Sequence, residues 1–143
     1  MTETRTVSLS RKFAAPPEMV FDAWLDPQVA GRWLFRTDGG RLERCEIDPR
    51  VGGGFRIDER RGAEIAEHHG EYLALDRPRR IVFDFWTSLS DERTRVTVEI
   101  AAEGEGSLLT LTHDGVWADW EVQTRQGWTT LLDGLAREIM PRQ

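Results

Sequence analysis

The segment QGWTTLLDGLARE, residues 126–138, decides the fold that the rest of the chain has to complete. Its large apolar side chains recur at intervals of three and four residues, which places them along one face of an α-helix. That face comprises Trp120, Thr124, Trp128, Leu131, Leu132, Leu135 and Ile139. A helix with so wide an apolar face must pack on an apolar surface, and the remaining sequence has to supply that surface.

Gly127 needs an explanation of its own, because glycine inside a helix costs about 1 kcal/mol relative to alanine. Two explanations are open. The glycine could allow the helix to approach the rest of the protein closely, or it could mark a kink that borders a pocket beside Trp128.

The surface is supplied by segments in which apolar and polar residues alternate, the pattern of half-buried β-strands. Turn signals rich in Gly, Pro and Asp separate them, as expected of consecutive antiparallel hairpins. We place one of these turns at Ser90 and Asp91. The predicted strands are residues 5–13, 41–47, 53–60, 64–75, 80–87, 94–102 and 107–115.

Alternation assigns the side chains of these strands to two faces. The apolar face holds Phe55, Ile57, Ile81, Phe83, Phe85, Val96, Val98, Ile100, Leu109, Leu111 and His113. The polar face holds Arg56, Asp58, Asp84, Thr97, Glu99, Thr110 and Thr112. A sheet with one apolar and one polar face is covered on one side only, so the C-terminal helix should lie on the apolar side.

Two short helices are predicted between the first and second strands. Pro16 and Pro17 suit a helix entrance, and the first helix should end at Asp26, because a residue before proline avoids helical angles. A second helix is expected over residues 28–33.

The composition is that of one soluble domain over residues 1–143, with a net charge of −6 that argues against nucleic-acid or anionic-membrane partners. The single cysteine, Cys45, cannot form an intramolecular disulfide and fits a reducing compartment. The sequence contains neither a signal-peptide pattern nor an apolar run of about 20 residues, so we expect a cytoplasmic protein without membrane insertion. A monomer and a homodimer both remain open.

Four segments in order resemble a known family: FDAWLDPQVAGRW (21–33), DPRVGGGFRI (48–57), HGEYLALDRPRRIVFDFW (69–86) and GWTTLLDGL (127–135). They are similar to signatures of the START-like SRPBCC superfamily, in its activator of heat shock protein 90 ATPase homologue-like branch. The resemblance covers nearly the whole chain. It implies an α+β helix-grip fold, in which a curved antiparallel sheet of about six to seven strands wraps the long C-terminal helix and two short helices follow the first strand.

The same resemblance implies a cavity between sheet and helix. Members of the superfamily bind hydrophobic or amphipathic small molecules, and some are cyclases, dehydratases or hydrolases. A minority activate a chaperone. The resemblance therefore identifies a fold and a cavity better than it identifies a reaction.

The three histidines are the candidates for acid–base chemistry. Strand parity points His113 inward, and one of His68 and His69 should also point inward, although a bulge near Gly70 could select either. His113 and His69 are the catalytic candidates, each weighed against a structural histidine that holds a backbone carbonyl. Glu67 and Glu71 flank the pair, so a carboxylate–histidine couple is conceivable. Adjacent histidines on a strand point to opposite faces, so we expect no metal and no cofactor.

Other residues suggest ordinary roles. The glycines at 52–54 precede neither a helix nor a Lys-Ser/Thr pair, so they form no phosphate loop, and Cys45 should be an inert thiol. Asp22, Asp26, Asp58 and Asp84 have basic neighbours and should be solvated or capping.

Six Trp and six Phe stand against one Tyr, and such rings either fill a core or line a cavity for an apolar ligand. In the resembled fold Trp33, Trp86, Trp117, Trp120 and Trp128 converge near the cavity mouth. Trp117 and Trp120 are either a lid or plain packing. The expected ligand-binding residues are Trp33, Phe55, Tyr72, Phe83, Phe85, Val98, His113, Trp117, Trp120, Trp128 and Leu131.

Three functions follow from these observations. The first is binding of a hydrophobic or amphipathic small molecule in the cavity. The second is a cyclase, dehydratase or hydrolase that uses a cavity histidine. The third is a chaperone-interacting module, which requires an exposed apolar patch on the outer face and ranks last because the predicted outer face is polar.

Overall fold

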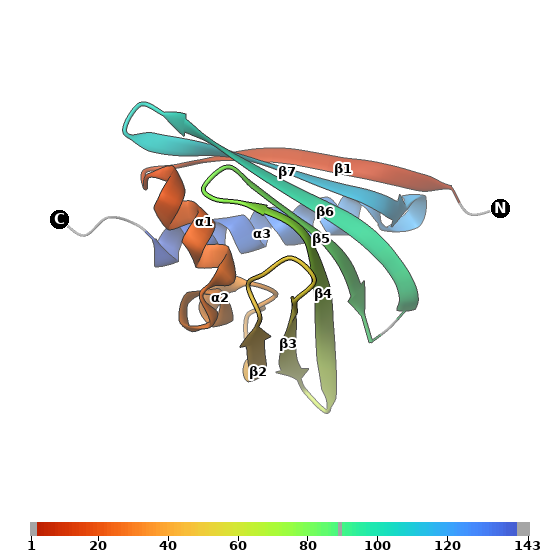
Figure 1. Cartoon of the computed structure of the whole chain (residues 1–143). Coiled ribbons are helices and arrows are strands. Elements are labelled where there is room, and N and C mark those ends of the chain that lie inside the picture. The colour runs from red at the N-terminus through yellow and green to blue at the C-terminus, as the bar shows by residue number, and fades with distance from the viewer. Residues whose placement is uncertain (1–2, 89, 140–143) are drawn as a thin grey trace.

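A seven-stranded antiparallel sheet wraps around one long helix in the computed structural model, which describes residues 3–88 and 90–139 (Figure 1). The strand order is β1-β7-β6-β5-β4-β3-β2. The strands are β1 (Thr4–Phe13), β2 (Arg41–Ile47), β3 (Gly54–Arg61), β4 (Glu64–Asp76), β5 (Arg80–Thr87), β6 (Ser90–Glu103) and β7 (Gly106–Trp117). The helices are α1 (Pro17–Leu25), α2 (Pro27–Trp33), the 3₁₀ turn η1 (Ala118–Trp120) and α3 (Glu121–Glu138).

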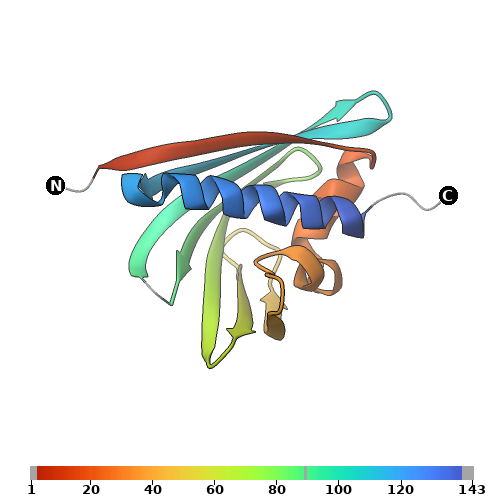
Figure 2. The ribbon, with the colours of Figure 1, turned by 180° about the vertical axis from the view of Figure 1, so that it is seen from behind.

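The predicted helix-grip fold is confirmed, with α3 lying across one face of the sheet (Figure 2). The predicted apolar stripe of α3 packs against the sheet, and its buried members are Trp128, Leu132 and Leu135. Asp26 ends α1 and caps α2, because its carboxylate accepts a hydrogen bond from the Gln28 N–H at 3.0 Å. None of the helices in the described ranges is both long and apolar enough to cross a membrane.

One local prediction was wrong, and one of the two explanations for Gly127 is excluded. β6 already begins at Ser90, so the turn after β5 precedes the Ser90–Asp91 position where we placed it. Gly127 is exposed, and a Cβ built on it would meet no atom within 4 Å, so close approach to the sheet does not explain this glycine. Helix α3 runs through Gly127 as one element from Glu121 to Glu138.

The loop between α2 and β2 enters the space between the sheet and α3. Phe35 has a φ of 58°, a left-handed value that is rare for a bulky side chain, and its ring is 6% exposed. It stacks on His68 with 4.5 Å between ring centroids and on Phe85 with 5.0 Å. These contacts, together with those to Phe55 and Trp128, compensate the unfavourable backbone angle.

Candidate functional site

A pocket of about 480 Å³ opens between the ends of β5, β6 and β7 and the start of α3. We call it the aromatic pocket. Its walls include Phe85, Trp86, Val116, Trp117, Trp120 and Thr124, and His113 and Thr94 lie beside them. Its volume falls within the range of small-molecule sites, and its lining is mostly apolar with a few polar groups, as in such sites.

Two tryptophans form the exposed part of this pocket. Trp117 ends β7 and is 38% exposed, and Trp120 precedes α3 and is 58% exposed. The Trp117 indole N–H donates a hydrogen bond of 2.6 Å to a carboxylate oxygen of Glu92, which fixes the position of that ring. Because both exposed rings line one pocket, they form an apolar patch of the kind that marks ligand or partner sites.

His113 lies in the pocket wall, is 5% exposed, and belongs to a chain of hydrogen bonds. The Trp128 indole N–H, which can only donate, approaches His113 Nδ1 at 3.0 Å. The neutral ring must therefore carry its hydrogen on Nε2, which lies 2.7 Å from Thr94 Oγ1. The Thr94 hydroxyl in turn donates to the Phe85 carbonyl at 3.3 Å.

Burial lowers the pKa of His113 from 6.5 to about 4, so the ring is neutral near pH 7. Both ring nitrogens are already engaged, and protonation of Nδ1 would break the bond from Trp128. This geometry is that of a histidine that holds β6, β7 and α3 together. To act as a base, His113 would first have to give up one of these bonds.

The two adjacent histidines on β4 point to opposite faces of the sheet. His68 is 8% exposed and points inward, and its Nδ1 donates to the Ile57 carbonyl at 3.1 Å. Burial lowers the pKa of His68 from 6.5 to about 4. The irregularity in the pairing of β4 with β5 falls after Tyr72 rather than near Gly70, so simple parity holds at His68.

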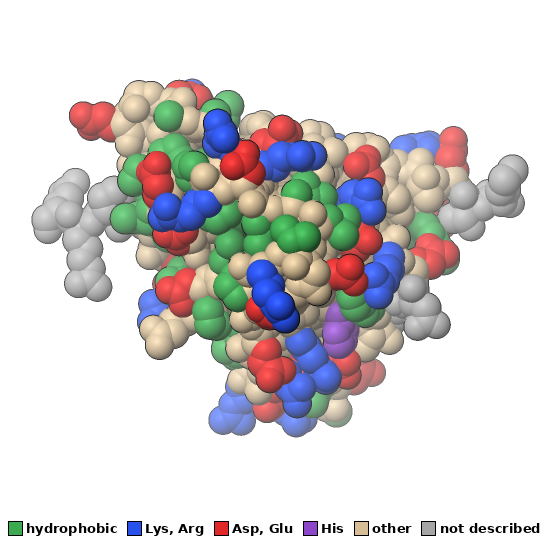
Figure 3. Space-filling view, in the orientation of Figure 1, with side chains coloured by type: hydrophobic (Ala, Val, Ile, Leu, Met, Phe, Trp, Pro, Cys, Tyr) green, Lys and Arg blue, Asp and Glu red, His purple; other side chains and the backbone are tan. Residues whose placement is uncertain are grey.

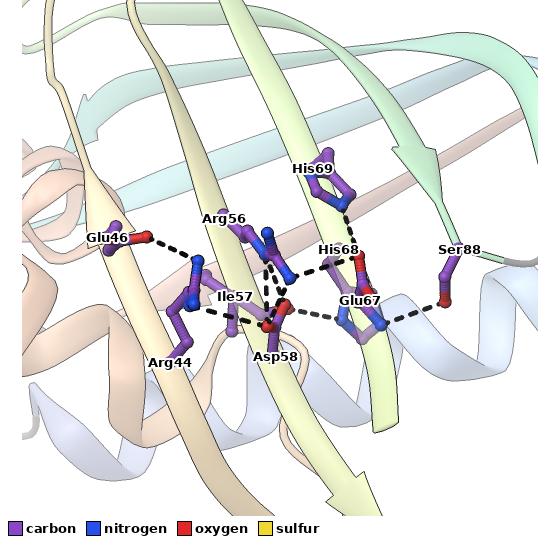
Figure 4. A network of polar contacts seen from close by, with 9 residues as sticks. All are labelled: Arg44, Glu46, Arg56, Ile57, Asp58, Glu67, His68, His69 and Ser88. Carbon is purple, nitrogen blue, oxygen red and sulfur yellow. Dashed lines mark hydrogen bonds and ion pairs between the residues drawn. The ribbon is translucent and has the colours of Figure 1, made fainter. Parts of the chain in front are cut away.

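His69 lies on the outer face, which contradicts its role as a cavity residue. Its Nε2 lies 3.1 Å from a Glu67 carboxylate oxygen, and its ring stacks on Trp86. The conceivable carboxylate–histidine couple therefore exists, but in the ion-pair network that crosses β2, β3 and β4 (Figure 4). Asp58 belongs to this network and is 5% exposed, so it is buried beneath Arg44 and Arg56 rather than solvated or capping as predicted.

The remaining predicted ligand-binding residues do not converge on one cavity. Phe55, Tyr72, Phe83 and Val98 are buried among one another and their neighbours in the core. Trp128 lies tilted against Trp24 in the same core, with 6.1 Å between ring centroids, whereas Trp33 and Leu131 border a second cleft beside α2. Of the predicted set, the aromatic pocket brings together Phe85, His113, Trp117 and Trp120.

Glu59 is a key residue that the sequence reasoning missed. Its side chain is fully buried, and it accepts hydrogen bonds from the Thr37 N–H and hydroxyl, at 2.9 and 2.7 Å, and from Nε of Arg36 and Arg61, at 3.0 and 2.7 Å. Burial alone would raise the pKa of Glu59, but these donors outweigh it and lower the pKa to about 2. Strand parity could have revealed the residue, because Glu59 follows Phe55 and Ile57 on the apolar face.

Other polar residues have structural surroundings. Cys45 is half-buried, its Sγ lies 3.5 Å from the Pro27 carbonyl, and burial raises the pKa of its thiol, as suits an inert cysteine. Asp22 pairs with Arg77 through two hydrogen bonds at the surface, and Asp84 pairs with Arg95. Within the described residues, no three His, Cys, Asp or Glu side chains are grouped so as to hold a metal ion.

The curved antiparallel sheet, the long helix that it grips and the pocket between them define a START-like helix-grip domain, a fold that supports ligand binding in general. The family model described as "Activator of Hsp90 ATPase homolog 1-like protein" matches residues 14–139, and the chain belongs to this family.

Solved structures agree with this assignment. Protein CV1439 from Chromobacterium violaceum is 27% identical, with a TM-score of 0.87 over 96% of this chain and 99% of that one. Protein Mll3558 from Rhizobium loti is 26% identical, with a TM-score of 0.84 over 97% and 99%. An AHSA1-like protein from Aeromonas hydrophila shares the fold at 24% identity, with a TM-score of 0.83 over 94% and 92%. No curated protein matches the chain significantly.

Proposed function

We propose that this protein binds a hydrophobic or amphipathic small molecule in the aromatic pocket between the sheet and the start of α3. The observation that carries the proposal is the pair of exposed tryptophans, Trp117 and Trp120, at a pocket of about 480 Å³ that Phe85 also lines. Aromatic rings around a concave apolar space gain most when a ring-bearing or acyl ligand covers them. Membership of a ligand-binding fold supports the same function.

Catalysis by a cyclase, dehydratase or hydrolase is the alternative at the same place. His113 borders the pocket, but its hydrogen bonds with Trp128 and Thr94 occupy both ring nitrogens. This arrangement favours binding without turnover. The outer face mixes acidic and basic side chains with hydrophobic ones (Figure 3) and carries the ion-pair network described above, which gives a chaperone-interacting role less support.

The test uses N-phenyl-1-naphthylamine, a neutral apolar probe whose fluorescence rises when it leaves water. At one hundred times its dissociation constant, a ligand stabilises the folded state by about 2.7 kcal/mol, so the melting temperature should also rise. Trp120→Ala should weaken binding, and Thr124→Trp should block it by filling the pocket.

Val122→Ala is the matched control, because Val122 is an exposed apolar residue two positions beyond Trp120, at 63%, outside the pocket lining. It should bind the probe as the unmodified protein does. If Trp120→Ala and Thr124→Trp both retained full affinity for the probe, the aromatic pocket would not be the binding site.

A further inference from the structure

A second cleft, of about 640 Å³, lies on the other side of the interior, between α2, the loop after it and α3. We call it the arginine cleft, because Arg32, Arg36, Arg61 and Arg137 all line it. These arginines come from four separate parts of the chain: α2, the following loop, β3 and α3. The stacked rings of Phe35 and Phe85 separate this cleft from the aromatic pocket, since Phe35 lines one and Phe85 lines the other.

Two of the arginines are held rigidly. The Nε groups of Arg36 and Arg61 both bond the buried Glu59 carboxylate, and the other nitrogens of Arg36 bond the carbonyls of Gly31 and Gly40, at 2.9 and 3.2 Å. Arg61 Nη2 reaches the Phe35 carbonyl at 3.4 Å. This wall of the cleft therefore presents fixed positive charge, only partly neutralised by the single carboxylate behind it.

The other two arginines keep donors available for a ligand. Arg32 Nη1 lies 3.8 Å from Glu138 Oε2, beyond hydrogen-bond distance, and its side chain is 64% exposed. Arg137 has no hydrogen bond or ion pair to any residue that the structure describes. Its Nη2 lies 3.6 Å from the point where a Cβ on Gly134 would stand, an ordinary van der Waals distance, so the guanidinium lies over this turn of the helix.

The cleft is positive in a protein that is negative as a whole. Among the residues that the structure describes, Asp38 is the one carboxylate that lines the cleft, and with Glu59 and Glu138 counted the four guanidiniums still outnumber the three carboxylates by one. The formal charge of the whole chain is −6. A local excess of positive charge in a concave site attracts anions, and guanidinium is well suited to carboxylate, sulfonate or phosphate groups.

The remaining lining of the cleft is apolar or neutral. Trp33, Phe35 and Leu131 contribute apolar surface, and the volume is far larger than a free inorganic anion needs. From the fixed wall, the available donors and these apolar residues, we propose that the arginine cleft is a second binding site, for an amphipathic small molecule with an anionic group that Arg137 and Arg32 bind.

The test compares two probes with the same ring system, 8-anilinonaphthalene-1-sulfonate and the neutral N-phenyl-1-naphthylamine. Arg137→Gln should weaken binding of the sulfonate about tenfold, and Arg32→Gln in addition should weaken it further, because each removes a charge-assisted contact. Affinity for the neutral probe should not change. Asp38→Asn should strengthen sulfonate binding at an unchanged melting temperature, and the melting temperature is measured because partly unfolded protein also binds this dye.

Arg50→Gln is the charge-matched control, because Arg50 is highly exposed and pairs with Asp48 outside the cleft. If the Arg32/Arg137 double variant bound the sulfonate as the unmodified protein does, the proposal would fail. An equal loss in Arg50→Gln would also overturn it, since the effect would then come from net charge. Loss of sulfonate binding only in Trp120→Ala would place this probe in the aromatic pocket, which refutes the cleft and leaves the proposed function intact.

Discussion

Lowering the pH from 7.5 to 5.0 should destabilise this protein through two histidines buried in the neutral form. Burial lowers the pKa of His68 and of His113 from 6.5 to about 4. In the unfolded chain both rings take up a proton near pH 6.5, whereas in the folded protein they resist it. Stability is therefore complete above the unfolded pKa and is lost as the pH falls towards the folded pKa.

The size of the effect follows from these two values. At pH 5.0 a histidine in the unfolded chain is almost fully protonated, whereas a folded one with a pKa of about 4 is mostly neutral. This difference lowers the free energy of unfolding by about 2 kcal/mol for each ring. Together, the two rings should lower the free energy of unfolding by about 4 kcal/mol, a large part of the roughly 5–15 kcal/mol that is typical of single domains. The Glu59 carboxylate, with its pKa lowered to about 2, stays ionised in the folded protein over this range, so its contribution to the difference stays small.

Urea unfolding followed by tryptophan fluorescence measures this difference directly. His113→Gln should lower stability at pH 7.5, because the bonds from Trp128 and to Thr94 change, but it should halve the loss between the two pH values. His68→Gln should halve it likewise. A loss below about 1 kcal/mol in the unmodified protein, or a full loss in His113→Gln, would refute this account of the buried rings.

Two further substitutions test the local structure. Glu59→Gln should destabilise the fold by about 3 kcal/mol and expose the loop around Phe35 to proteolysis, because Arg36 and Arg61 lose their shared buried carboxylate. Urea unfolding and limited proteolysis measure these two effects. A variant as stable as the unmodified protein would contradict the prediction. Gly127→Ala should raise stability by about 0.5–1 kcal/mol, because its Cβ meets nothing within 4 Å and alanine favours the helix. Gly31→Ala is the comparison, and it should bring no gain in stability because its Cβ would lie 3.1 Å from Leu42. If Gly127→Ala were destabilised instead, the helix would need a glycine at this position.

Much of the fold could be predicted because it rests on periodicity. The alternation in the strands and the three-and-four spacing around Trp128 identified the sheet, its covered face and the helix that covers it. The inward direction of His113 followed from the same parity. The choice between His68 and His69 required the position of the β4 irregularity, which depends on the pairing with β5 and not on local sequence.

The division of the interior could not be predicted, because it depends on one loop. Phe35 adopts a backbone angle that its residue type disfavours, and contacts distant in sequence stabilise that angle: the stacked rings around Phe35, and the buried Glu59 that bonds the next turn at Thr37. Its ring then fills the space between the sheet and α3 where the family resemblance led us to expect a single cavity. The stack of His68, Phe35 and Phe85 leaves an apolar pocket at one end and an arginine-lined cleft at the other. The aromatic residues expected around one ligand are therefore divided between two sites of opposite chemical character and the core between them.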